Sequence, residues 1–141
     1  MARSADKKLN IIVLTVERQV YNGQADIVTV PAVDGELTIM PDHIALITPL
    51  GVGVLGARDG EKDEIVALHA GFLKVEDDDI TVLADAAERA ADIDVQRAMS
   101  AKQRAEDMLA RTDAAGVELE AAGAALRRAL LRLRVAGWIR Y

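Results

Sequence analysis

The nineteen residues ITVLADAAERAADIDVQRA, from Ile80 to Ala98, contain the point at which the chain changes its pattern. From Ile80 to Leu83 the residues are branched and, except for Thr81, apolar, which favours a β-strand. After Ala84 the chain is rich in Ala, Arg and Glu, which favour a helix. Asp92 and Asp94 are residue types that cap helix N-termini, and they predict a helix from there to about residue 111. The sequence therefore divides into a β half and a helical half.

The β half contains short apolar runs separated by Gly, Pro and the turn pairs at 34–35 and 59–60. The expected strands are 9–16, 25–31, 36–40, 45–48, 52–58, 64–69, 71–76 and 79–83. Their spacing predicts an antiparallel β-sandwich or barrel. Pro31, Pro41 and Pro49 are expected where strands end, because proline lacks a donor for the sheet.

The helical half is interrupted at 112–116, and a second helix is expected from about 117 to 136, stopped by Gly137. The two helices predict an antiparallel hairpin, with domains at 1–87 and 88–141. Its expected apolar stripes are Leu126, Leu130 and Leu133 on the second helix, and the weaker Val95, Ala98, Ala105 and Leu109 on the first. Alanines bury little area, so the hairpin is either a movable element or is packed permanently on the sandwich.

Composition narrows the classes of function. Hydrophobic residues make up 51% and aromatics 3% of the 141 residues, and there is no cysteine. The net charge of −6, with so few aromatics, argues against nucleic-acid binding. No apolar run approaches the roughly 18 residues of a spanning helix, and the polar start predicts no signal peptide. The protein is therefore expected to be soluble, or attached to something membrane-bound.

The charge is unevenly distributed. Residues 1–89 carry 8 basic and 16 acidic side chains, whereas residues 90–141 carry 9 basic and 7 acidic ones. After Glu120 the charged residues are all arginines, at positions 127, 128, 132, 134 and 140. This basic end indicates either an anionic partner or a solvated helix face favoured by the helix dipole.

Catalytic signals are missing from the sequence. There is no P-loop and no nucleophile beside a base, so no catalytic residue is expected. His43 and His69 are not spaced as metal ligands, and His69 is expected to be structural. The acidic run 77–79 lacks the further oxygen ligands of a calcium loop and predicts a hairpin turn. No metal site is therefore expected.

Four stretches resemble one family. Gly35-Glu36-Leu37-Thr38-Ile39-Met40-Pro41-Asp42-His43-Ile44-Ala45-Leu46 looks like G-E-L-x-I-x-P-x-H-A-P-L, with Ala45 in place of a proline. Residues 70–75 resemble G-G-F-L-E-V, residues 80–85 match V-T-V-L-A-D closely, and residues 20–23 resemble the segment near the family's N-terminus. From about 11 to 136, the chain is similar to the epsilon subunit of bacterial F-type ATP synthases.

The resemblance implies a non-catalytic rotor subunit that couples ion flow to ATP synthesis and inhibits ATP hydrolysis through a movable hairpin. It implies three partners: the gamma subunit, the c-subunit ring and, through the hairpin, the α/β hexamer. It implies a peripheral place on the cytoplasmic face of a bacterial cell membrane, without insertion. Glu36 and His43 would lie at the interface with gamma and the ring, unless they are ordinary exposed loop residues.

A subset of that family binds ATP through an I/L-D-x-x-R-A motif, which residues 93–98 match. The resemblance implies ATP as a regulatory ligand, held without a metal by Glu88, Asp94, Arg97, Ala98, Arg104, Arg128 and Arg132. Arg97 and Arg104 share one helix face, as do Arg128 and Arg132. ATP would favour the folded-down hairpin over the extended, inhibitory one. The alternatives are an epsilon subunit that does not bind ATP, whose arginines serve the inhibitory contact or salt bridges, and a stand-alone nucleotide-sensing or adaptor module.

Overall fold

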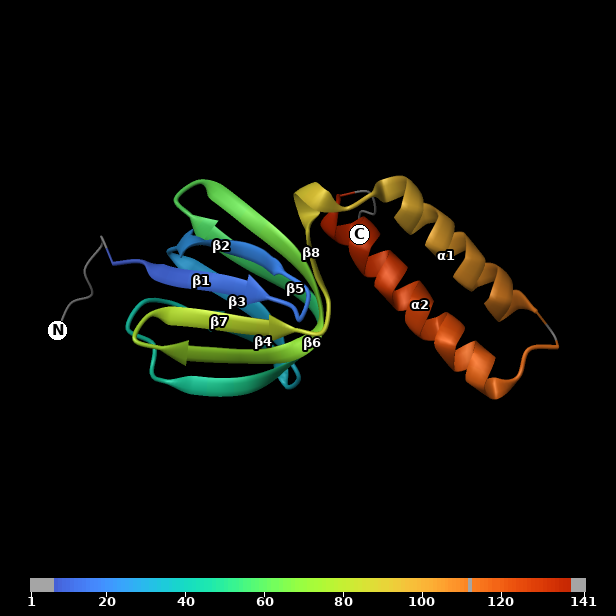
Figure 1. The fold of residues 1–141 in the computed structure, drawn as a ribbon, viewed down its shortest axis with the longest axis horizontal. Coiled ribbons are helices and arrows are strands. Elements are labelled where there is room, and N and C mark those ends of the chain that lie inside the picture. The colour runs from blue at the N-terminus through green and yellow to red at the C-terminus, as the bar shows by residue number, and fades with distance from the viewer. Residues whose placement is uncertain (1–6, 112, 138–141) are drawn as a thin grey trace. The chain divides into compact units, whose positions relative to one another are not determined.

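The computed structural model describes residues 7–111 and 113–137, and it divides after Arg89 into two compact units. Within the described residues, the first unit consists of eight strands (Figure 1). They are β1 (Leu9–Leu14), β2 (Gln19–Ala25), β3 (Ile27–Ala32), β4 (Gly35–Ile39), β5 (Leu46–Asp59), β6 (Lys62–Glu76), β7 (Asp79–Ala84) and β8 (Ala87–Arg89). The predicted β fold is confirmed.

The strands form one sheet in the order β2-β1-β7-β6-β5-β3-β4, with β8 added on β6. The β1–β7 pair is parallel, and the other pairs are antiparallel. The two ends of the order, β2 and β4, do not pair, so the sheet is not a closed barrel. The long strands β5 and β6 curve, so that the sheet folds over on itself around the core (Figure 1).

Inward-facing branched residues fill this core. In β7, Ile80, Val82 and Ala84 are buried, and they alternate with residues that are more exposed, as expected for a strand with one face inward. The largest fully buried side chains of the unit include Leu9, Ile11, Ile39, Leu55, Leu68 and Leu73. At roughly 25 cal/mol per Å² of apolar surface, their burial is the main force that holds the sandwich together.

Two expected strand breaks are wrong. The runs 45–48 and 52–58 belong to one strand, β5, and the runs 64–69 and 71–76 belong to one strand, β6. Ala70 and Gly71 have φ angles of 66° and 144°, so glycine marks a bend and not an end. A Cβ on Gly71 would lie 2.2 Å from the Leu83 carbonyl oxygen, which shows how closely β6 and β7 approach there.

The expectation for the prolines is also wrong in part. Pro41 follows β4, but Pro31 lies inside β3 and Pro49 inside β5. The β3–β5 register is irregular between Thr29 and Ala32, which allows Pro31 to sit there without a donated hydrogen bond. A Cβ on Gly53 would lie 2.6 Å from the Pro31 Cβ, so this glycine makes room for the proline ring.

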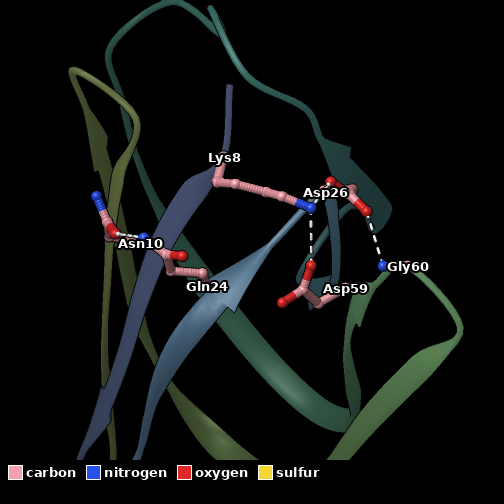
Figure 2. Close-up of polar contacts among 6 residues, drawn as sticks. All are labelled: Lys8, Asn10, Gln24, Asp26, Asp59 and Gly60. Atoms are coloured by element: carbon pink, nitrogen blue, oxygen red, sulfur yellow. Dashed lines mark hydrogen bonds and ion pairs between the residues drawn. The ribbon is translucent and has the colours of Figure 1, made fainter. Parts of the chain in front are cut away.

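Lys8 joins three segments at one end of the sandwich (Figure 2). Its Nζ lies 2.5 Å from Asp26 Oδ1 and 2.8 Å from Asp59 Oδ1. The other oxygen of Asp26 accepts a hydrogen bond of 2.8 Å from the Gly60 amide. These contacts link the start of β1 to the β2–β3 junction and to the β5–β6 turn, and they raise the pKa of Lys8, with the hydrogen bond to Asp26 as the largest cause.

The second unit contains a short 3₁₀ helix, η1 (Ala90–Asp92), and the two predicted helices, α1 (Val95–Ala110) and α2 (Gly116–Val135). The helices pack against each other as an antiparallel pair (Figure 1). The buried residues of α1 are Ala98 and Ala105, and those of α2 are Ala122, Ala129, Leu131 and Leu133. Among the described residues, no helix is long and apolar enough to span a membrane.

The expected apolar stripes are correct only in part. Leu130 is 37% exposed and Leu109 is 38% exposed, whereas Ala98, Ala105, Ala129 and Leu133 are buried. We call these last four residues the seam. Alanines occupy three of its four positions, because small side chains let two helix backbones come close, and Leu109 and Leu130 lie outside it. Arg140 and Thr112 lie outside the described residues.

Candidate regulatory and partner-binding sites

Asp94 caps the first long helix. Its backbone is extended (φ −81°, ψ 102°), and its Oδ1 accepts a hydrogen bond of 3.0 Å from the Arg97 backbone amide. This satisfies one of the amides that a helix start leaves without an intrahelical partner. Of the two residues predicted as caps, Asp92 and Asp94, Asp94 is therefore the one that caps α1. The cap also explains part of the I-D-x-x-R-A motif by local structure, because the aspartate and the residue three places on are joined through the backbone.

The four predicted arginines share one relation to the seam: each comes directly before a seam residue. Arg97 and Arg104 precede Ala98 and Ala105 on α1, and Arg128 and Arg132 precede Ala129 and Leu133 on α2. A residue one place earlier lies about 100° around the helix, always in the same sense when viewed from the N-terminus. Because the helices are antiparallel, these two flanks face the same edge of the hairpin.

Along this edge the arginines are unevenly spaced. Counting outward from the loop between α1 and α2, Arg97 comes level with the stretch between Arg128 and Arg132. Arg104 comes about one to two helical turns nearer the loop. Arg97, Arg104 and Arg128 are exposed, and Arg132 is half-buried. Within the part of the chain that the structure describes, no ion pair joins Arg97, Arg104 or Arg128 to a carboxylate. The edge therefore carries concentrated positive charge.

The other two predicted ATP ligands are placed differently. Ala98 is 2% exposed in the seam, and its backbone amide donates to the Asp94 carbonyl oxygen at 3.0 Å. Its small side chain thus has a packing role. Glu88 lies in β8, opposite Ala67 of β6, and so belongs to the first unit. The other six residues belong to the second unit.

Glu36 and His43 are not brought together. Glu36 is exposed at the start of β4, beside the β3–β4 turn, where it pairs with Pro31. His43 is half-buried beyond the other end of β4, and its Nδ1 lies 2.7 Å from the Ile44 carbonyl oxygen. The residues that line a hollow with His43 include Lys7, Asp42 and Asp78. The exposure expected for Glu36 is confirmed, and His43 reaches the surface only in part.

The outer face of the sheet carries an apolar row that was not predicted from sequence. Leu14, Leu83, Phe72 and Pro49 are register partners across β1, β7, β6 and β5. Phe72 is 58% exposed and Leu83 is 56% exposed. We call these four residues the apolar row. Exposed apolar side chains that lie next to one another on a sheet face are typical of contact surfaces. The sequence gives little indication of this row, because the four residues are far apart along the chain. They become neighbours only through the register of the four strands.

The acidic run and His69 have structural places in the sheet. Among residues 7–111 and 113–137, no group of three or more His, Asp or Glu side chains could hold a metal ion. The acidic run forms the β6–β7 turn, with Asp77 and Asp78 at φ angles of 50° and 65°. His69 is buried within β6, where its amide donates to the Ala86 carbonyl oxygen at 2.9 Å. Both residue groups have the structural places that the sequence predicted.

Two family models together match nearly the whole chain. Residues 8–90 match the β-sandwich domain of the ATP synthase delta/epsilon chain, and residues 91–137 match its long α-helix domain. The two matches meet at the division between the two units. The chain therefore belongs to the delta/epsilon family of ATP synthase subunits.

Relatives of the chain include bacterial epsilon chains. The epsilon chain of Symbiobacterium thermophilum is 48% identical over 134 residues, which cover 94% of each chain. That of Halalkalibacterium halodurans is 45% identical over 129 residues, which cover 92% of this chain and 97% of the relative. The predicted recognition is confirmed: the chain is similar to bacterial epsilon chains over more than nine-tenths of its length, and it is a non-catalytic subunit of this family.

Solved structures of similar fold come from mitochondrial ATP synthases. A chain of the Euglena gracilis OSCP/F1/c-ring structure has a TM-score of 0.63 at 16% identity, with 93% of this chain and 78% of that chain covered. A chain of the Tetrahymena thermophila central stalk/c-ring structure has a TM-score of 0.54 at 14% identity, with coverages of 94% and 99%. At these identities the likeness concerns the fold alone.

Proposed function

We propose that this subunit belongs to the rotor, that its sandwich binds the gamma subunit and the c-ring, and that its hairpin restrains ATP hydrolysis. ATP acts as a regulatory ligand that stabilises one position of the hairpin. The family and the epsilon-type relatives support the stalk assignment. The place that follows is peripheral, on the cytoplasmic face of the bacterial cell membrane, where the hairpin can reach the α/β hexamer.

The observation that carries the nucleotide proposal is the shared edge of the hairpin. Each of the four arginines directly precedes a seam residue in the sequence. The packing that closes the hairpin therefore also places the four guanidinium groups along one edge. A triphosphate would neutralise this charge and accept paired hydrogen bonds from the planar guanidinium groups. A ligand that binds only the closed hairpin shifts the equilibrium by its differential affinity for that state.

The test is titration calorimetry of the purified chain with ATP, together with the thermal midpoint in ATP. We expect wild type to bind ATP and to gain thermal stability. Arg128→Ala should weaken binding by roughly tenfold or more, because it removes a charge-assisted contact. Arg127→Ala is the matched control, since Arg127 lies one residue earlier on the same helix and points away from the shared edge.

Absence of heat with wild type, together with an unchanged thermal midpoint for Arg128→Ala in ATP, would refute ATP binding. Equal losses in Arg127→Ala and Arg128→Ala would instead indicate diffuse electrostatic attraction without a site. Asp94→Asn separates the capping of α1 by Asp94 from its proposed role as an ATP ligand, because asparagine still caps the helix but carries no charge.

The apolar row supports the partner half of the proposal. Phe72 and Leu83 are large apolar side chains that remain more than half exposed on a sheet face. Large apolar and aromatic side chains that become buried supply much of the binding energy of protein interfaces. We assign this face to the gamma subunit, whereas Glu36 and His43, at opposite ends of β4, would contact gamma and the c-ring at the margins.

Co-purification with gamma tests this assignment. Phe72→Glu should lower the affinity for gamma at least roughly tenfold, because a charge would have to be buried in the interface. Val16→Glu is the control, since Val16 is 99% exposed beyond the end of β1 and outside the apolar row. Full binding by Phe72→Glu would exclude the apolar row as the gamma surface.

A further inference from the structure

The last strand of the sandwich is short and lies next to the joint between the two units. β8 has three residues, which pair with Val66, Ala67 and Leu68 of β6. Five residues, 90–94, then separate it from α1. A three-residue strand makes few ladder hydrogen bonds, so it needs side-chain contacts to stay on the sheet. Those contacts decide where the sandwich ends and the joint begins.

Arg89, the final residue of β8, supplies such contacts. Its Nε donates to Glu64 Oε1 at 2.6 Å and its Nη2 to Glu64 Oε2 at 3.0 Å, which makes a two-point ion pair. The guanidinium carbon also lies 5.6 Å from the centre of the Tyr21 ring, within cation–π distance. The Arg89 and Glu64 side chains are only 35% and 20% exposed, so the pair is partly shielded from water.

Both charges affect the pKa of the Tyr21 phenol. Burial raises its pKa most, the Glu64 carboxylate raises it further, and the Arg89 guanidinium opposes them. The three side chains come from β2, β6 and β8, which are far apart in sequence. Tyr21 and Glu64 thus form a fixed binding position on the sandwich. Arg89, the last residue of β8 before the joint, occupies this position.

We propose that Arg89, Glu64 and Tyr21 form a latch that holds β8 on β6 and makes Ala90 the first residue of the joint. With the latch closed the joint has five residues, and release of β8 makes it eight. Three extra residues add roughly 10 Å of reach. The latch therefore limits how far the helical unit travels, and this regulatory consequence rests on the movement proposed above.

Hydrogen exchange of the full chain tests the latch without ATP or a partner. Arg89→Gln and Glu64→Gln should each speed exchange of the β8 amides by roughly tenfold, while amides in β1 and β7 are unchanged. The exchanged pair Glu64→Arg with Arg89→Glu should restore protection. The control is Arg58→Gln, which breaks an exposed pair with Asp63 (Nε to Oδ1, 3.0 Å) on the β5–β6 hairpin. Unchanged β8 exchange in both single variants would overturn the proposal.

The pKa of Tyr21 provides a second test. A general loss of stability would not lower this pKa in one variant and raise it in the other. The chain has two tyrosines, so Tyr141→Phe leaves Tyr21 as the only phenol. In that background, Glu64→Gln should lower the pKa of Tyr21 and Arg89→Gln should raise it, measured by tyrosinate absorbance. Absence of either shift would show that the three groups do not meet in solution.

Distances between labels test the effect on reach. The chain has no cysteine, so Val16→Cys and Val117→Cys, both exposed positions, accept a label on each unit. Arg89→Gln should broaden the distance distribution and Arg58→Gln should not. If β8 exchange rises while the distribution stays unchanged in Arg89→Gln, the latch does not limit the joint. Wild-type ATP titration is independent of all three measurements, so its failure would count only against nucleotide binding.

Discussion

Gly71 shows how one residue type permits a bend inside a strand. Its φ of 144° is open to glycine but strained for other residues, and a Cβ there would meet the backbone of β7. Ala70, immediately before it, already has a φ of 66°, which costs an alanine about 1–2 kcal/mol. The bend therefore stores strain at one residue and relies on glycine at the next.

Replacement of this glycine should be costly. Gly71→Ala is expected to lower the free energy of unfolding by about 2–4 kcal/mol, because the methyl group has rigid backbone as its neighbour. Urea unfolding followed by circular dichroism measures the change. Gly51→Ala is the control, since its added Cβ would be 3.9 Å from the Pro31 carbonyl oxygen, an ordinary contact. Equal losses in the two variants would contradict the steric explanation.

At the scale of elements, α1 and α2 are held by a seam of three alanines and one leucine and by a side-chain cap at the start of α1. The start of α2 has no side-chain cap, because its N-cap residue is Ala115. Short helices gain little stability from propensity alone, so the cap and the seam both matter. A cap substitution should therefore be felt by the whole hairpin.

Asp94→Ala should lower the stability of the helical unit by about 1 kcal/mol, because the Arg97 amide loses its acceptor. Thermal melting monitored by the helical circular dichroism signal measures the loss in the full chain. Asp92→Ala provides the comparison, since Asp92 is exposed in η1 and does not cap α1. A larger loss of stability in Asp92→Ala than in Asp94→Ala would show that Asp94 is not the residue that caps α1.

At the scale of the whole molecule, Lys8 closes the sandwich by joining segments up to 51 positions apart in sequence. Its pKa is raised above the ordinary 10.5, first by the hydrogen bond to Asp26. Burial likewise raises the pKa of Tyr21 above 10.0. Both groups bind protons more tightly in the folded chain, so their contribution is complete at lower pH and is lost as pH rises through the folded-state pKa values.

The thermal midpoint should therefore fall as pH rises above about 10. Lys8→Met should be less stable at neutral pH and should show a shallower fall in alkali, because one of the groups with a raised pKa, which also include Lys7 and Tyr21, is gone. Lys62→Met, at the exposed first position of β6, should keep the wild-type slope. If Lys8→Met has the same slope as wild type, Lys8 does not contribute to the alkaline loss.

Much of the fold could be predicted from sequence because its signals are local. Branched residues identified β7, the Asp34-Gly35 pair identified the β3–β4 turn, and Asp94 was one of two residues named as a helix cap. Of the candidate ATP ligands, the short motif contains Arg97, whereas Arg104, Arg128 and Arg132 came from the family resemblance, and their role in binding ATP stays a prediction. The prediction failed for Leu130, because a leucine repeat does not reveal which face meets the other helix when alanines pack more closely.

Local patterns in the chain were enough to predict the β half, the helical half, the family resemblance and the residues that can carry charge or cap a helix. Three features became visible only in three dimensions: two pairs of expected strands are single bent strands, four apolar residues align across four strands, and Arg89 meets Glu64 and Tyr21. The physical reason is that periodicity fixes which side chains share a face of one element, whereas contacts between elements depend on register and on bends set by distant partners.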